Sequence, residues 1–359
     1  MVFSSHIDVL SVFDKRHQLI ADNDTLNVAY GIDKNYAVGC GISIASTLIN
    51  NEIDFTFHVF SDDFDDDFIK KLNVLAEKFK TKIVLYKINS EILKTLPCTD
   101  IWSHAMYFRL LAFSHLSDKI SSLLYLDADV MCKGSLAQLH KLDTAPHVAA
   151  VIRDVPEMQK KSASRLKIPT LEGEYFNSGV LFVNLEIWNE LDLTKKIFEK
   201  LINGDESIQY PDQDIMNILL HNNVSFLPRE YNTIYSIKNE LSDPSHQKYK
   251  ESIKDDTILI HYTGVTKPWH KWANYPSTIF FQRAFHESPW LTSDLKDATL
   301  FVEMKKKYKH LIAKKKYFSG YLSCFLYGIR KISKKSAIHY KYNKWFCKIV
   351  DRLKGTQSD

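Results

Sequence analysis

Strands and helices alternate over the first 130 residues, and this pattern limits the possible folds of the chain more than any other feature. The apolar, strand-forming runs lie at 27–32, 55–60, 82–88 and 123–126, and stretches with helical apolar spacing separate them at 37–49, 65–79 and 103–115. Strands joined in this way pair in parallel, with helices on both faces of the sheet. The sequence therefore predicts an α/β fold with a mostly parallel central sheet, and 359 residues suffice for one large domain with an extension.

The run at 123–126 leads into two carboxylates, Asp127 and Asp129, which are separated by one residue. In an extended chain, residues i and i+2 share a face, so both side chains would point the same way. Ligands bind at the carboxyl ends of the strands in such sheets, and paired carboxylates there suit a hard divalent cation such as Mg²⁺ or Mn²⁺. An acidic turn after a strand is the alternative explanation of the same two residues.

A second segment with strong chemical character follows an apolar strand at 258–262. A histidine at a strand end, His261, can complete a metal site that two aspartates begin. The loop after it contains Gly264 and Lys267, which can meet a phosphate with backbone N–H groups and a positive charge. A structural role for a lone buried histidine is the alternative, and the upstream aspartate pair favours the ligand.

The turn after the first strand offers a carboxylate, an amide and an aromatic ring within four residues, at Asp33, Asn35 and Tyr36. These groups could read a base edge, hold a ribose and stack on a ring. The segment lacks the G-x-G-x-x-G pattern, which argues against a dinucleotide-binding fold. An ordinary polar loop is the alternative.

Two shorter segments carry polar side chains that allow two roles each. Asn177 could bond a sugar hydroxyl, but an asparagine so close to a glycine is often a turn former. Asp212 lies at the start of a predicted helix at 212–220, where an aspartate commonly caps the first turn.

Charge is distributed unevenly along the chain. Residues 301–359 hold 16 Lys and Arg against 3 Asp and Glu, whereas the whole chain has a net charge of only +4. The basic clusters at 305–307, 314–316 and 334–335 flank aromatic and aliphatic residues such as Phe318 and Phe325. This pattern favours an interfacial helix on an anionic membrane surface, with a nucleic-acid patch or a basic helix packed on the body as alternatives.

Targeting signals are not apparent in the sequence. The first 20 residues lack a continuous apolar core, and no run approaches the length that spans a bilayer. The five cysteines are widely spaced and form no metal-binding pattern. We therefore expect a cytoplasmic protein, or one held on the cytosolic face of a membrane.

Six segments, in order along the chain, together resemble glycosyltransferase family 8, the retaining nucleotide-sugar enzymes that include glycogenin and bacterial lipopolysaccharide core transferases. They are AYGIDKNY at 29–36, MYFRL at 106–110, LYLDADV at 124–130, YFNSGVLFVNL at 175–185, PDQD at 211–214 and HYTGVTKPW at 261–269. The resemblance is strongest to the lipopolysaccharide outer-core glucosyl- and galactosyltransferases. It implies a GT-A type nucleotide-sugar-binding domain at 26–295, between an N-terminal extension at 1–25 and a membrane-associating helical region at 296–359.

The resemblance also implies roles for residues at matching positions. Those for the nucleotide are Gly31, Asp33, Asn35, Tyr36 and Ala128, with Asp127 near the ribose. Those for the metal are Asp127, Asp129 and His261, and those for the diphosphate are Gly264 and Lys267. Those around the donor sugar and the chemistry are Arg109, Asp154, Asn177, Asp212 and Gln213.

The function implied by the resemblance is metal-dependent transfer of glucose or galactose from a UDP-hexose to the lipopolysaccharide core, forming an α linkage. The cation would be Mg²⁺ or Mn²⁺, and the acceptor would be anchored to lipid on the inner membrane, with no nucleic acid involved. Gln213 would lie near the anomeric carbon, and a carboxamide is a poor nucleophile, so retention without a covalent intermediate is favoured. A metal-dependent phosphohydrolase and a non-catalytic nucleotide-sugar-binding protein are the alternatives.

Overall fold

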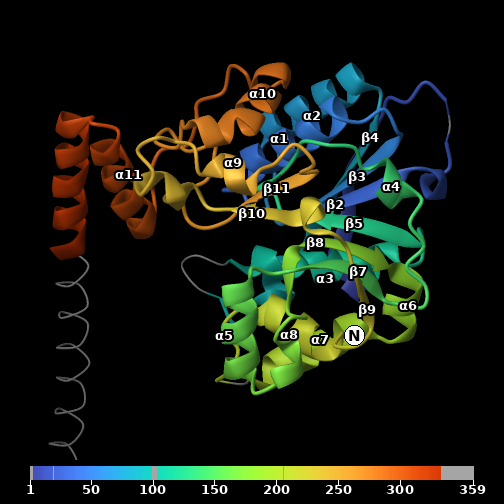
Figure 1. Ribbon diagram of the computed structural model, residues 1–359. Helices are drawn as coiled ribbons and strands as arrows, with labels where there is room; N and C mark the ends of the chain where they lie inside the picture. The colour runs from blue at the N-terminus through green and yellow to red at the C-terminus, as the bar shows by residue number, and fades with distance from the viewer. Residues whose placement is uncertain (1–2, 19, 99–102, 205, 333–359) are drawn as a thin grey trace, which may run out of the picture.

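The computed structural model describes residues 3–18, 20–98, 103–204 and 206–332, and its centre is an eight-stranded mixed sheet (Figure 1). The strand order is β1-β4-β3-β2-β5-β8-β7-β9. Their bounds are β1 (Ile7–Asp14), β2 (Leu26–Ile32), β3 (Phe55–Ser61), β4 (Lys82–Ile88), β5 (Ser122–Leu126), β7 (Ala149–Arg153), β8 (Phe176–Asn184) and β9 (Val224–Phe226).

The alternating segments form the parallel part of this sheet, as the sequence predicts. Strands β4, β3, β2 and β5 pair in parallel, because a helix carries the chain back after each of β2, β3 and β4. These helices are α1 (Ala37–Ile49), α2 (Asp66–Phe79) and α3 (Phe108–Leu116). Antiparallel pairs then extend the sheet, β1 beside β4 at one edge and β8 between β5 and β7 at the other.

Helices cover both faces of the sheet, and each face has its own hydrophobic core. One layer holds α1, α2 and α10 (Ile279–Glu287). The opposite layer holds α3, α6 (Leu185–Glu190), α7 (Leu193–Asn203) and α8 (Pro211–Leu219). Along β5, Leu124 and Leu126 face the first core whereas Leu123 and Tyr125 face the second, which is the twofold alternation of a strand buried on both sides.

A second, three-stranded sheet lies across the carboxyl end of β5. Its order is β10 (Thr233–Tyr235), β11 (Leu259–Tyr262) and β6 (Val130–Cys132). Since β6 begins directly after Asp129 and pairs antiparallel with β11, His261 lies opposite Val130. Three further helices are α4 (Ala137–His140), α5 (Pro156–Leu166) and α9 (Tyr249–Ser252).

Residues 7–14 belong to the main sheet, although the sequence placed them in an N-terminal extension. They form β1, an edge strand on which Val9 and Val12 are half exposed. Edge strands have only one neighbour and tolerate polar residues, so the mixed composition of this segment did not stand out as a strand.

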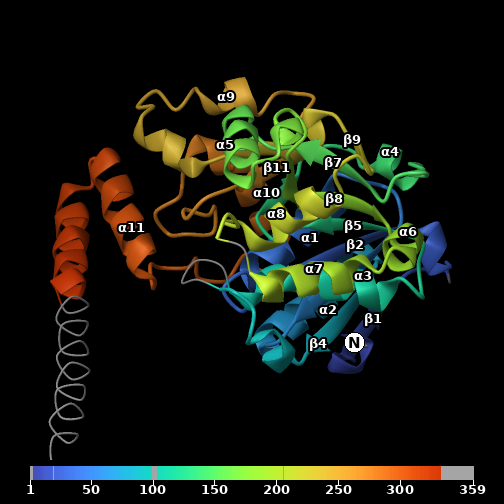
Figure 2. The ribbon, with the colours of Figure 1, turned by 90° about the horizontal axis from the view of Figure 1, so that it is seen from below.

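The described part of the chain ends in two helices that stand at the margin of the molecule in both views (Figures 1 and 2). They are α11 (Phe301–Ala313) and a helix over 317–332, which we call the terminal helix. The basic pair Lys334 and Lys335 of the predicted tail lies outside the described residues. Within the described ranges, no helix combines the length and the apolar character needed to cross a membrane.

Candidate active site

The two aspartates after β5 converge through a tight turn rather than through strand alternation. Strand β5 ends at Leu126, and the Val130 N–H then donates to the Asp127 carbonyl across 3.0 Å. The Asp127 N–H donates to the Gly179 carbonyl of β8 at 2.8 Å. Asp129 is buried, whereas the Asp127 side chain is partly exposed to solvent. The turn therefore holds one carboxylate inside the protein and one nearer the surface.

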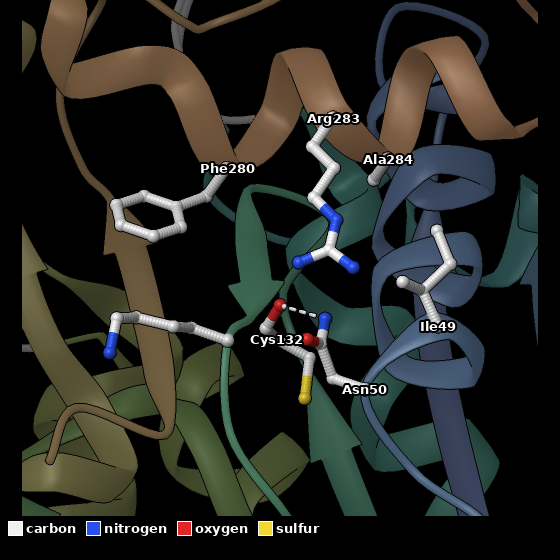
Figure 3. Close-up of a pocket in the computed structure, with 7 residues that line it drawn as sticks. Ile49, Asn50, Cys132, Phe280, Arg283 and Ala284 are labelled. Atoms are coloured by element: carbon white, nitrogen blue, oxygen red, sulfur yellow. Dashed lines mark hydrogen bonds between the residues drawn. The ribbon is translucent and has the colours of Figure 1, made fainter. Parts of the chain in front are cut away.

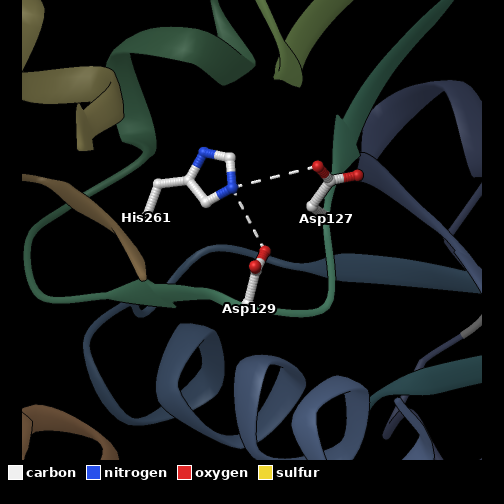
Figure 4. A group of neighbouring side chains, drawn as sticks. All are labelled: Asp127, Asp129 and His261. Carbon is white, nitrogen blue, oxygen red and sulfur yellow. Dashed lines mark ion pairs between the residues drawn. The ribbon is translucent and has the colours of Figure 1, made fainter. Parts of the chain in front are cut away.

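Strand β11 brings His261 to this pair (Figure 4). Its Nε2 lies 3.2 Å from Oδ1 of Asp129 and 3.9 Å from Oδ2 of Asp127. The backbone fixes this approach, since the Tyr262 N–H donates to the Asp129 carbonyl at 3.0 Å. One ligand atom from each of the three side chains falls within 4.8 Å of the others.

A run of side-chain amides orients the histidine. The Asp154 carboxylate only accepts hydrogen bonds, so the Nδ2 of Asn177, 3.2 Å away, must be a donor. The Oδ1 of Asn177 then accepts from Asn232, whose own Oδ1 lies 3.2 Å from Nδ1 of His261. Nδ1 therefore carries a hydrogen, and Nε2 is the nitrogen available to a cation.

These residues fit a hard divalent cation. Two carboxylates and one imidazole form a donor set that Mg²⁺ or Mn²⁺ accepts. Strand β8 leaves room beside them because Gly179 has no Cβ. A methyl group there would overlap the His261 ring and lie 2.7 Å from Oδ2 of Asp127.

The loop after β11 adds a buried cation. Lys267 donates from Nζ to Oδ2 of Asp129 and to the Tyr262 carbonyl, the latter at 3.0 Å. Burial opposes charge on both partners, but their mutual attraction prevails: it raises the pKa of Lys267 and, with His261, holds the pKa of Asp129 well below its usual range. Gly264 has a φ of 90°, which lets the loop turn back toward the site.

The turn after β2 lies against this loop. Asp33 accepts from the Asn35 N–H at 2.8 Å and from the Ser103 hydroxyl at 2.7 Å. The Tyr36 ring meets the edge of Trp269 with centroids 5.7 Å apart. The predicted nucleotide turn and the predicted diphosphate loop are therefore neighbours.

Gly31 occupies a packing position in the structure. A Cβ there would lie 2.8 Å from the Cβ of Phe108, so the glycine allows β2 to approach α3 closely. Ala128 is buried in the turn between the two aspartates.

Arg109 of α3 lies between Asp127, a candidate metal ligand, and Asp212 of α8. Its Nη2 donates to Oδ1 of Asp127 at 2.8 Å, and its Nε lies 3.3 Å from Oδ2 of Asp212. Burial raises the pKa of Asp212, and the guanidinium offsets only part of that effect. A buried arginine thus holds two carboxylates from different elements in fixed positions.

The remaining predicted residues form a hydrogen-bonded group next to Arg109. Oε1 of Gln213 accepts from the Ser178 N–H at 3.0 Å and from Asn177 at 3.2 Å. Its Nε2 donates to Asp154 and to the Tyr175 hydroxyl, both at 3.1 Å. The carboxamide is held on all sides, so its orientation is set before any ligand enters.

The structure removes the capping explanation of Asp212. Helix α8 begins at Pro211 and Asp212 does not cap it; instead Asp214 accepts the N–H groups of Gln209 and Tyr210 at 2.8 and 2.9 Å. Asn177 lies within β8, where its Oδ1 also accepts the Gly179 N–H two residues on at 3.1 Å. This local bond is the kind that the turn-former explanation describes, and it accompanies the contacts of Asn177 within the pocket.

Sequence reasoning missed Asn232, Ser178 and Tyr175. Tyr175 and Ser178 lie within the recognised segment 175–185 but were assigned no role, and Asn232 lies in no recognised motif. Only contacts across the fold reveal what these three side chains do. The one usable signal was position, since Asn232 directly precedes a strand, β10, that pairs in parallel with the histidine-bearing β11.

A separate cavity of about 230 Å³ lies between α1, β6 and α10 (Figure 3). None of the predicted site residues lines it. Its lining residues are Ile49, Asn50, Cys132, Lys133, Phe280, Arg283 and Ala284.

Comparison with known families identifies the chain along most of its length. The profile described as "Glycosyl transferase family 8" matches residues 27–273. The profile described as "Glycosyl transferase family 8 C-terminal" matches residues 275–331, which include α11 and most of the terminal helix. All the residues assembled in the pocket fall within the first match.

Two bacterial relatives match almost from end to end. A lipopolysaccharide 1,2-glucosyltransferase of Escherichia coli strain K12 is 48% identical, over 92% of this chain and 98% of its own length. A lipopolysaccharide 1,3-galactosyltransferase of Salmonella typhimurium is 37% identical, over 90% of this chain and 96% of its own length.

Solved structures agree with the predicted fold. The galactosyltransferase LgtC, in complex with donor and acceptor sugar analogs, superimposes with a TM-score of 0.61 at 24% identity, covering 74% of this chain and 96% of LgtC. The apo structure of the bifunctional glycosyltransferase WbbM gives a TM-score of 0.61 at 18% identity, covering 77% of this chain and 52% of WbbM. At these identities the likeness confirms the GT-A type fold.

Proposed function

The chain belongs to glycosyl transferase family 8, and we propose that it transfers glucose or galactose from a UDP-sugar to the core oligosaccharide of lipopolysaccharide. The observation that carries this proposal is the convergence of Asp127, Asp129 and His261 beside the Lys267 ammonium. Such a pocket suits a cation together with a diphosphate. The near full-length relatives, which are named for lipopolysaccharide glucosyl and galactosyl transfer, support the acceptor class.

The two aspartates and His261 would hold Mg²⁺ or Mn²⁺, which supplies a Lewis acid for the charge that develops on the departing UDP. Lys267 contributes a positive charge fixed by burial, at the edge of the same space. Arg109 keeps Asp127 aimed at that space through its 2.8 Å bond. Asp33, Asn35 and Tyr36 form the turn beside the Lys267 loop, and a nucleoside could contact these three residues there.

The group around Gln213 supports transfer with retention and without a covalent intermediate. A carboxamide is a weak nucleophile, and its oxygen already accepts the Ser178 N–H. Asp212 is tied to Arg109 and lies 3.4 Å from the Ser178 hydroxyl. We therefore favour attack by the acceptor on the face from which UDP leaves, with Asp154, Asn177 and Asp212 binding sugar hydroxyls.

The terminal helix suits a position on the cytosolic face of the inner membrane, next to a lipid-anchored acceptor. Phe318 is 84% exposed and Phe325 is 65% exposed, and Tyr321 beside them is 63% exposed. Basic residues at 305–307 lie on α11, and those at 314–316 lie in the turn that joins α11 to the terminal helix. Apolar side chains next to lysines bind the surface of an anionic bilayer without spanning it.

Product analysis tests the proposal. The purified chain would be incubated with UDP-glucose or UDP-galactose, Mn²⁺ and core lipopolysaccharide, and NMR of the product would give the anomeric configuration. We expect a hexose in α linkage from one donor. Release of inorganic phosphate from phosphate esters would favour a phosphohydrolase, and donor binding without turnover would favour a binding protein; either result overturns the proposal.

A further inference from the structure

Helix α11 lies behind the loop that carries Lys267, and it touches this loop through three polar side chains. These side chains, Glu303, His310 and Lys314, are spaced by seven and four residues, which places them on one face of the helix. Glu303 and His310 are buried, although both belong to a segment whose composition is that of a solvated basic tail. A polar residue is seldom buried without a specific partner.

Glu303 reaches the backbone of Lys267 through one intermediate side chain. Its Oε1 lies 3.7 Å from Nε2 of His270, and Nδ1 of His270 accepts the Lys267 N–H at 3.1 Å. Its Oε2 accepts the N–H groups of Thr299 and Leu300 at 2.8 and 2.9 Å, which ties the start of α11 to the same carboxylate.

His310 holds the residue next to Lys267. Its Nε2 lies 3.2 Å from the hydroxyl of Thr266, and its Nδ1 lies 2.8 Å from the hydroxyl of Tyr275. The imidazole is fully buried, so these two bonds satisfy both of its ring nitrogens.

Lys314 closes the contact at the end of the helix. Its Nζ donates to the carbonyls of Trp272 and Asn274 at 2.9 and 2.7 Å, and it lies 3.9 Å from the centroid of the Tyr275 ring. The segment 266–275 is therefore held near its start by His310, near its middle by Glu303 and near its end by Lys314.

We propose that α11 positions the Lys267 loop for the donor diphosphate, and that Glu303, His310 and Lys314 are positioning residues of the transfer reaction. This inference rests on the proposed function, in which Lys267 contacts the diphosphate. Lys267 lies in irregular chain between β11 and α10, and an isolated bridge between His270 and Lys296 pairs the following residues with another segment, but it does not include Lys267. Contacts from α11 meet part of the entropic cost of ordering such a loop. The same helix bears the terminal helix, so the membrane-facing part of the chain and the donor pocket share one support.

The test compares two variants with a matched control in the full-length protein. His310→Phe and Lys314→Met keep most of the side-chain volume and remove the hydrogen bonds. His58→Phe is the control, because His58 is also buried and bonded to two side chains, Tyr86 and Asn27, away from the loop. Hydrogen exchange of the segment 262–275, followed by mass spectrometry without ligand, reports the order of the loop.

We expect His310→Phe and Lys314→Met to accelerate exchange in 262–275 about tenfold and to weaken Mn²⁺-dependent UDP binding, measured by calorimetry, about five- to tenfold, as the loss of one or two net hydrogen bonds implies. The control should change neither quantity, whatever it does to the melting temperature. His310→Gln, which can still bond Thr266, should recover most of the UDP affinity.

Unchanged exchange in 262–275 in either folded variant would overturn the positioning role. A faster exchange with unchanged UDP affinity would overturn it as well, since the order that α11 gives the loop would then not serve donor binding. If the wild type itself does not bind UDP with Mn²⁺, the proposed donor is wrong, and the exchange measurement still decides whether α11 orders the loop.

Discussion

The donor pocket and the terminal helix both violate the usual placement of residues, and they do so in opposite directions. The pocket buries Asp129, Arg109 and Lys267, residues that normally stay in water. The terminal helix exposes to water aromatic side chains, Phe318 and Phe325 among them, that are normally buried. Burying an ion costs several kcal/mol unless it is paired, and leaving a large apolar side chain exposed forgoes about 1.5–3 kcal/mol.

The two regions differ in where the compensation is found. Each buried charge of the pocket has its partner on the same chain, as in the pairs Lys267 with Asp129 and Arg109 with Asp127. Phe318 and Phe325 remain largely uncovered in the described part of the molecule. The comparison teaches that the charges of the pocket are compensated within the chain, whereas the apolar side chains of the terminal helix would be compensated by the surface proposed above. It also predicts that one substitution can break the pocket, while the helix must lose several side chains.

The largest expected effect is that of Asp129→Asn. This change removes one of the three proposed metal ligands and leaves the Lys267 ammonium buried without its carboxylate. We expect transfer to fall about 10³-fold and Mn²⁺-dependent UDP binding to disappear in calorimetry. Glu240→Gln is the matched control, since Glu240 is another buried carboxylate whose partners, Tyr235 and His246, lie outside the pocket. A UDP affinity in Asp129→Asn equal to that of the wild type would show that these residues hold no metal.

Removing the terminal helix should separate chemistry from membrane binding. A chain ending at Lys316 keeps α11 with Glu303 and His310, so slow hydrolysis of the UDP-hexose should stay within about twofold of the wild type. Binding to anionic liposomes, and transfer to a lipid-anchored acceptor, should fall about 10²-fold. This is the effect expected when Phe318 and Phe325 no longer insert into the membrane surface.

Paired substitutions guard this result against effects of truncation. Phe318→Ser with Phe325→Ser should reduce liposome binding as the truncation does, whereas Val9→Ser with Val12→Ser, at apolar positions 53% exposed on β1, should leave it unchanged. Equal liposome binding by all these proteins would remove the membrane from the proposal.

An intermediate effect is expected for Gln213→Ala. The carboxamide binds Ser178, Asn177 and Asp154 but contacts none of the metal triad. Turnover should therefore fall about 10²-fold while UDP affinity stays near that of the wild type. Gln159→Ala, at an equally buried amide that bonds the Asp154 backbone, is the control for local loosening. Mass spectrometry of the wild type with donor alone should find no hexose on residues 212–214; a kinetically competent adduct would establish a covalent route.

The smallest expected effect concerns acid stability. Burial lowers the pKa of His58, His270 and His310 to about 3. The unfolded chain protonates these groups near pH 6.5 and the folded chain does not, so stability must fall as the pH drops from about 6.5 toward 3. Each histidine contributes up to about 1.4 kcal/mol per pH unit. Urea unfolding at pH 7, 6 and 5 should show this slope, and His58→Phe should reduce it by one proton; equal slopes would contradict the prediction.

The parallel half of the sheet was predictable because its strands are buried on both faces and its connections are short-range helices. Strand β1 was not, since its pairing with β4 joins residues 68 to 81 positions apart, as in Asp14 with Lys82 and Ile7 with Ile88. The antiparallel insertion of β8 between β5 and β7 likewise depends on contacts between distant segments.

The sequence predicted which residues would lie together in the pocket, but it did not predict the hydrogen bonds and ion pairs among them. The motifs identified Asp127, Asp129, His261 and Lys267, because their chemistry is explicit in the residue types. No motif indicates that Asn232 fixes the tautomer of His261, or that Arg109 spans Asp127 and Asp212. Such contacts arise where elements meet in space. Composition was misleading for α11, whose lysines conceal the buried Glu303 and His310.

Gly179 has a consequence for how mutational surveys of this protein would be interpreted. Any side chain at this position of β8 collides with His261 and Asp127, so a saturation library would record it as intolerant throughout. An intolerant position beside a metal triad invites assignment as a ligand, yet glycine contributes no donor atom. A map of tolerated substitutions would therefore mark residues that leave space beside the proposed ligands as well as the ligands themselves. Excess Mn²⁺ would not rescue Gly179→Ala, because the added methyl group occupies space beside His261 and Asp127 and removes no ligand atom.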